Sequence, residues 1–215
     1  MTQNTPHTGT RKPAEPEQPH QSRRARLRAE KLHAAKVRRH RTWLLLVGAL
    51  VAIGVIAYGL VSAAPTSGDV STKAPDFTLP TTDGTSVTLS ALRGKPVILY
   101  FNEGAGCGSC TVQMAEIEKD PGFAAAGITV LPIVMNTAEQ IQPDLDTYHV
   151  TSPYLLDDGT VSTAYDVLGK GMHEGLPGHG FVLIDADGNQ RWYGNYPSMW
   201  LEPAELLKEA TSRLG

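Results

Sequence analysis

An uncharged apolar stretch near the N-terminus is the feature that most constrains this chain. No charged residue lies between Arg41 and Asp69, and residues 43–64 read WLLLVGALVAIGVIAYGLVSAA. A helix of that length rises by about 1.5 Å per residue and spans roughly 33 Å, the thickness of a bilayer core. It lacks the polar face of a helix packed on a soluble core. We therefore predict a transmembrane helix over residues 43–64. The alternative is a cleaved signal peptide, whose apolar region is usually shorter, about 7–15 residues.

Charge is divided unequally between the two sides of this stretch. Residues 1–42 hold eleven of the 19 Lys and Arg and three of the 22 Asp and Glu, a net charge of +8, whereas residues 43–215 carry −11. The positive-inside rule then predicts a cytoplasmic N-terminus and an extracytoplasmic part over residues 65–215. Residues 1–42 are expected to be a basic, largely disordered tail. Its basic run either only fixes the topology or also attracts anionic lipid, and we expect the lipid bilayer rather than nucleic acid as its partner.

The outer part alternates between strand and helix patterns. Residues 65–75 (PTSGDVSTKAP) are polar and predict a linker. Residues 96–101 (PVILYF) and 128–135 (ITVLPIVM) are continuous apolar runs, typical of strands buried on both faces. Two Asp-Gly pairs between other strand-like runs favour hairpins. This order predicts an α/β sandwich with a mixed central sheet over residues 76–215.

The only two cysteines form the motif Cys107-Gly108-Ser109-Cys110, between a buried strand and an expected helix. The backbone N–H groups and the dipole of a helix N-terminus stabilise a thiolate, which favours Cys107 as a nucleophile. Cys110 lies one helical turn deeper and could attack a mixed disulfide formed by Cys107. An extracytoplasmic domain would also lie in an oxidising compartment. The motif therefore predicts a redox pair. A structural disulfide, half of a metal site and a chance pair of thiols remain alternatives.

Three stretches resemble the redoxin branch of the thioredoxin superfamily, which includes AhpC/TSA-like peroxiredoxins and membrane-anchored thiol–disulfide oxidoreductases. They are APDFTLPTTDGTSVTLSALRGKPVILYF, then CGSC, then GHGFVLIDADGNQRW, within about two-thirds of the chain. The resemblance implies a thioredoxin-like three-layer sandwich with Cys107 as the nucleophile and Cys110 as the resolving thiol. We also expect protein thiols and disulfides as substrates, a separate redox partner and no cofactor.

Several positions depart from the patterns of that superfamily. Peroxiredoxins typically have Pro seven residues and Thr or Ser three residues before the reactive cysteine, where this chain has Tyr100 and Gly104. The hydroxyl that would hold a peroxide oxygen is therefore missing. Gly106 replaces the Trp that usually precedes the first cysteine in thioredoxin-like reductases, and His179 falls in the place of their cis-Pro. These departures favour thiol–disulfide exchange, with a thiol peroxidase as the alternative.

Other polar residues are candidates for supporting roles. Glu103 could accept the proton of the resolving thiol, or it could be a solvated loop carboxylate. His179 could face the cysteines and exchange a proton with them, or simply pack beside the loop. Met172 and His173, together with the cysteines, could hold Cu(I), which gives a copper-binding chaperone as an alternative of another class. Copper-delivery relatives, however, usually space their cysteines CxxxC, and we expect no metal.

Overall fold

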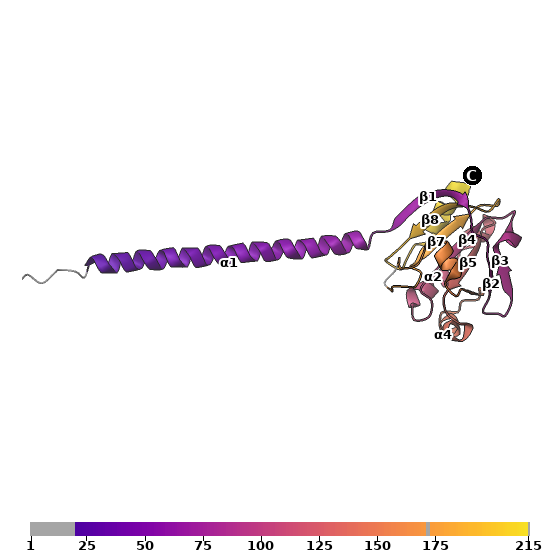
Figure 1. Ribbon diagram of the computed structural model, residues 1–215, viewed down its shortest axis with the longest axis horizontal. Helices are drawn as coiled ribbons and strands as arrows, with labels where there is room; N and C mark the ends of the chain where they lie inside the picture. The colour runs from indigo at the N-terminus through magenta and orange to yellow at the C-terminus, as the bar shows by residue number, and fades with distance from the viewer. Residues whose placement is uncertain (1–19, 171–172, 215) are drawn as a thin grey trace, which may run out of the picture. The chain divides into compact units, whose positions relative to one another are not determined.

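The computed structural model describes residues 20–170 and 173–214, which divide into two compact units that meet between Ala57 and Tyr58. The first unit consists of most of α1 (His20–Ser62), a single long helix (Figure 1). By length and composition, Arg23–Ser62 could cross a membrane, and a signal sequence would meet the same criteria.

The basic segment before the apolar stretch is helical from His20 onward, so the expectation of a largely disordered tail is wrong for residues 20–42. This segment is rich in Arg, Ala, Lys and Leu, which are strong helix formers. Adding residues to an existing helix avoids the cost of nucleation, so the apolar helix extends into the basic run. Residues 1–19 lie outside the described residues.

The second unit is built on a mixed central sheet, as predicted, and the sheet has six strands in the order β1-β8-β7-β4-β5-β6. Figure 1 labels all of these strands except β6. Its strands are β1 (Thr66–Lys73), β4 (Val97–Phe101), β5 (Thr129–Val134), β6 (Leu155–Leu156), β7 (Gly180–Ile184) and β8 (Asn189–Asn195). Strands β4, β5 and β6 are parallel, and β7 pairs antiparallel with β4. Strands β8 and β1 continue the antiparallel half. Both apolar runs of the sequence form central strands, with β4 buried along its whole length.

Alternate residues of β4 face two hydrophobic clusters, and these define three layers. Ile98 and Tyr100 belong to the first cluster, which includes residues of four helices. These are α2 (Gly108–Lys119), α3 (Pro121–Ala125), α4 (Ala138–Tyr148) and α6 (Pro203–Leu214). Leu99 and Phe101 belong to the second cluster, on the other face of the sheet. That face is covered by the hairpin β2 (Thr78–Pro80) and β3 (Ser86–Thr88), the 3-10 helix η1 (Leu89–Leu92) and α5 (Thr160–Ala164).

Residues 65–75 do not form the expected linker, because most of them make up the edge strand β1. It pairs antiparallel with β8, from Thr66 opposite Asn195 to Lys73 opposite Asn189. The strand is almost entirely exposed, and its pairing depends on backbone groups rather than on apolar side chains. Its polar sequence resembled a linker because an edge strand in water needs no hydrophobic face.

Candidate active site

Both cysteines lie where β4 leads into α2. Cys107 is the N-cap of α2 and forms a disulfide with Cys110, with 5.3 Å between their Cα atoms. The Sγ atom of Cys107 accepts a hydrogen bond from the backbone N–H of Cys110 at 3.3 Å. Cys107 is partly exposed, whereas Cys110 is completely buried. Only the first sulfur is therefore accessible to a partner from solution.

The loop before the first cysteine is held by a continuous set of hydrogen bonds. Four consecutive backbone N–H groups donate to acceptors within the domain. The bonds run from Gly104 to Asn102 Oδ1 (3.0 Å), from Ala105 to Asn136 Oδ1 (2.9 Å), from Gly106 to Asp144 Oδ2 (2.8 Å) and from Cys107 to the Gly104 carbonyl (3.0 Å). In this oxidised form the four N–H groups are already engaged, and the loop has a defined conformation.

The absence of a hydroxyl residue at position 104 has a steric reason. Gly104 has a φ of +77°, and a Cβ atom there would come within 1.8 Å of Asn136 Oδ1. Neither Thr nor Ser fits without moving that side chain and straining the backbone. The site therefore cannot hold a hydroxyl at this position in its present conformation.

A surface pocket of about 520 Å³ lies beside Cys107 and contains an acid–histidine pair. The Glu103 side chain lines the pocket and is only 5% exposed, so the alternative of a solvated loop carboxylate is wrong. Its Oε2 atom lies 2.7 Å from Nδ1 of His173, whose side chain is 63% exposed. Leu176 and Met199 add apolar lining. The accessible sulfur and a buried carboxylate thus line the same pocket, and the exposed His173 connects that carboxylate to solvent.

His179 lies on the buried side of the cysteine motif, and the structure gives it no hydrogen bond to either cysteine side chain. Its Nδ1 atom is 3.1 Å from the Tyr100 hydroxyl, whose single proton is shared between this nitrogen and the Cys110 carbonyl at 3.0 Å. Its Nε2 atom is 3.3 Å from Gln113 Oε1, which accepts the backbone N–H of Leu201 at 2.8 Å. These partners fit the neutral tautomer with the proton on Nε2. Burial lowers the pKa of His179 to about 3, so this ring is uncharged near neutral pH.

Of the residues considered for copper, His173 lines the pocket beside Cys107. Met172 lies outside the described residues, and His173 is paired with Glu103. Within residues 20–170 and 173–214, no three His, Cys, Asp or Glu side chains form a group suited to a metal ion.

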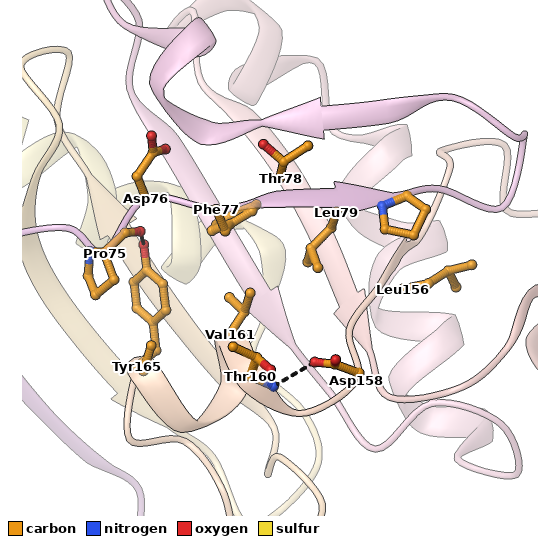
Figure 2. A pocket seen from close by; sticks show the side chains of 12 residues that line it. Pro75, Asp76, Phe77, Thr78, Leu79, Leu156, Asp158, Thr160, Val161 and Tyr165 are labelled. Carbon is orange, nitrogen blue, oxygen red and sulfur yellow. Dashed lines mark hydrogen bonds between the residues drawn. The ribbon is translucent and has the colours of Figure 1, made fainter.

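A second pocket, of about 480 Å³, lies between β2 and α5 (Figure 2). Its apolar lining includes Phe77, Leu79 and Val161, and Figure 2 shows Asp158 bonded to the backbone of Thr160 at its edge. The residues that line it include no cysteine or histidine. This pocket therefore offers no group for thiol chemistry.

The fold and the cysteine site define a thioredoxin-like protein of the thiol-dependent oxidoreductase class. The chain belongs to the AhpC/TSA family, whose model matches residues 70–193. This match confirms the redoxin resemblance of the sequence.

Two activities occur in the names of curated relatives of this chain. It is 36% identical over 129 residues to a Mycobacterium tuberculosis protein named "Putative peroxiredoxin Rv2521", covering 57% of this chain and 80% of that one. It is 32% identical over 130 residues to the thiol-disulfide oxidoreductase ResA of Bacillus subtilis, covering 59% and 72%. Since both names occur among the relatives, the choice between the two activities depends on the site.

Solved structures confirm the fold. Peroxidoxin BcpB of Mycobacterium tuberculosis superposes with a TM-score of 0.58 at 22% identity, over 68% of this chain and 99% of that one. A secreted disulfide oxidoreductase of the same organism gives a TM-score of 0.50 at 24% identity, over 63% and 95%.

Proposed function

We propose that this chain is a membrane-anchored thiol–disulfide oxidoreductase. The observation that carries the proposal is the Cys107–Cys110 disulfide at the start of α2, with one sulfur accessible and the other buried. In the reduced protein, the Cys107 thiolate attacks a substrate disulfide and displaces one substrate thiolate. Cys110 then attacks Cys107, which closes the internal disulfide and releases the second substrate sulfur. Two electrons pass to the substrate, and under an oxidising poise the same steps run in reverse.

Glu103 is the proposed proton acceptor for the resolving step. Cys110 is closed to solvent, so the proton of its thiol must leave through a protein group before the sulfur can attack. Glu103 lines the pocket beside Cys107, and His173 connects its carboxylate to solvent. His179 has the different role of a neutral, buried support that reaches the cysteine motif through Tyr100.

The proposed partners are protein thiols and disulfides outside the cytoplasmic membrane. The long apolar helix supports a single-pass anchor, and the basic residues before it support a cytoplasmic N-terminus. A separate redox partner must return the pair to its starting state, because each turnover changes it by two electrons.

A thiol peroxidase is the second candidate, favoured by the mycobacterial relative's name. Peroxide would oxidise the Cys107 thiolate to a sulfenic acid, and Cys110 would displace water to form the disulfide. Against this, Gly104 excludes a hydroxyl residue, and the neighbouring backbone N–H groups already have acceptors.

The deciding experiment uses the reduced 215-residue chain in nonionic detergent. It compares how this protein reacts with two oxidants, the disulfides of insulin and hydrogen peroxide. We expect insulin to be reduced, and peroxide to oxidise Cys107 no faster than an ordinary thiol. Cys110→Ser should trap a mixed disulfide with insulin, and Cys107→Ser should trap none. Rapid peroxide consumption without insulin reduction would establish the peroxidase instead. Stoichiometric retention of Cu(I), lost in His173→Ala, would indicate the copper chaperone.

A further inference from the structure

A carboxylate on a helix that is distant in sequence accepts a hydrogen bond from the residue that precedes the nucleophilic cysteine. Asp144 lies on α4, and its Oδ2 atom accepts the backbone N–H of Gly106 at 2.8 Å. The side chain is partly buried. Nothing in the sequence pattern around Cys107 indicates this contact, because 38 residues separate its two partners.

The contact opposes the usual effect of a helix N-terminus. Backbone N–H groups and the helix dipole stabilise a thiolate at the N-cap, and Cys107 receives one such bond from the Cys110 N–H. At Gly106, however, the N–H group donates to the Asp144 carboxylate, which places a negatively charged side chain on the residue directly before Cys107. The Asp144 carboxylate and a Cys107 thiolate would both be negatively charged, so they repel each other across Gly106. Asp144 therefore raises the free energy of the Cys107 thiolate, whereas the uncharged disulfide is unaffected.

The residues that line the pocket beside the sulfur provide no fixed positive charge to offset this repulsion. The first turn of α2 carries no acidic residue, so it adds no further negative charge beside Cys107. The pocket adds the carboxylate of Glu103 and the imidazole of His173, and the residues that line it include no lysine or arginine. From α4, Tyr148 places its hydroxyl close to Gly108, where an added Cβ atom would lie 2.5 Å from the oxygen. Only a protonated His173 would bring positive charge to the pocket.

We propose that Asp144 is a positioning residue that biases the Cys107–Cys110 pair toward its disulfide and so makes the reduced protein a net electron donor. This inference rests on the proposed thiol–disulfide exchange and adds its preferred direction. The equilibrium concerned is protein disulfide plus two glutathione thiols giving protein dithiol plus glutathione disulfide. The protein disulfide gains two electrons and two protons, and both come from the two thiols. Since only the thiolate form of Cys107 feels the charge, the bias grows as this thiol ionises.

The test uses the 215-residue chain in nonionic detergent, equilibrated with glutathione buffers between pH 6 and pH 9. Asp144→Asn keeps an oxygen acceptor for the Gly106 N–H but removes the charge. At pH 9, we expect the equilibrium constant for reduction of the protein disulfide by glutathione to be three- to tenfold larger in this variant than in the parent. At pH 6, the two equilibrium constants should be equal. Tenfold corresponds to 29.6 mV for a two-electron couple. Alkylation of Cys107 at pH 7 should become faster by a similar factor.

Two further variants separate charge from structure. Asp146→Asn makes the same charge change two residues along α4, where the Asp146 side chain is exposed and bonded to Gln142, and it should behave as the parent. Asp144→Ser is a second neutral variant with an oxygen acceptor, used if Asp144→Asn does not fold.

Three results would overturn the inference: no shift in the neutral variant, an equal shift at every pH, or an equal shift in Asp146→Asn. An equal shift at every pH would indicate a purely structural effect. If the parent itself exchanged no disulfide with glutathione, the proposed function would fail instead, and that outcome is distinguishable from the other three.

Discussion

The two sides of the cysteine pair differ in what surrounds them. On the pocket side, which consists of Cys107, Glu103 and His173, ionisable groups connect the accessible sulfur to solvent. On the buried side, which consists of Cys110, Tyr100, His179 and Gln113, every side chain is enclosed and the histidine is neutral. The proton transfer and substrate contact that we propose therefore belong to the pocket side. The buried side has the separate task of fixing the start of α2 against β4.

The largest expected effect is a loss of stability when the loop before Cys107, which belongs to the pocket side, is distorted. Gly104→Ala should lower the free energy of unfolding by roughly 3–5 kcal/mol, because a Cβ atom would overlap Asn136 Oδ1 and a positive φ is unfavourable for alanine. Thermal and urea unfolding measure the loss. Gly84→Ala is the matched control, since Gly84 has a φ of +81° but no atom within 4 Å of an added Cβ. Its cost should be only about 1 kcal/mol. Equal losses in the two variants would show that Asn136 does not constrain the loop.

The second prediction concerns proton transfer on the pocket side. Reduced protein reacting with an aryl disulfide releases one coloured thiolate when Cys107 attacks and a second when Cys110 resolves. Glu103→Gln should slow the second release by about 10²-fold, as expected for the loss of a general base, and leave the first nearly unchanged. Glu174→Gln removes a charge from the exposed loop beside His173 and should leave both phases unchanged. An unaffected second phase in Glu103→Gln would remove Glu103 from the mechanism.

Much of the fold could be predicted from the sequence because the relevant patterns are local. The apolar run that became β4, followed by CGSC, placed Cys107 at a helix N-terminus, and the structure confirms that position. Contacts between distant segments could not be predicted in this way. Asn136 and Asp144 reach the loop because β5 lies parallel to β4, so that the segments after both strands meet at one edge of the sheet. The burial of Glu103 likewise depends on packing, since its neighbours in sequence are equally compatible with an exposed loop.

The third prediction uses the buried histidine. Because the pKa of His179 falls from 6.5 in the unfolded chain to about 3 in the folded protein, only the unfolded state binds this proton between those values. The free energy of unfolding is therefore highest above pH 6.5 and decreases as the pH falls. This histidine alone accounts for a loss of about 2 kcal/mol between pH 8 and pH 5.

A variant without an ionisable ring should lack that part of the acid sensitivity. Denaturant unfolding at several pH values should give a shallower decrease for His179→Gln than for the parent, whatever its stability at pH 8. His149→Gln, which replaces an exposed histidine at the end of α4, is the control and should retain the parental slope. Parallel curves for the parent and His179→Gln would mean that the ring is solvated.

The smallest expected effect comes from removing the Tyr100 hydroxyl on the buried side. This change should lower stability and leave the reactivity of Cys107 nearly unchanged. Burial raises the pKa of Tyr100 well above its usual value, so its hydroxyl remains a donor shared between the Cys110 carbonyl and His179. Tyr100→Phe removes this donor and should cost about 1–2 kcal/mol of unfolding free energy. The rate of Cys107 attack should change by less than about twofold, because the nucleophile lies on the other side of the pair.

Tyr154→Phe is the matched control for the buried hydroxyl. Tyr154 is also fully buried, but its hydroxyl has no hydrogen-bond partner among the described residues. Removing an unsatisfied polar atom should leave stability unchanged or slightly higher, as judged by the same urea titration. If Tyr100→Phe slowed Cys107 while leaving stability intact, the two sides would not be separable in function. The hydroxyl would then belong to the chemistry of the pair rather than to its support.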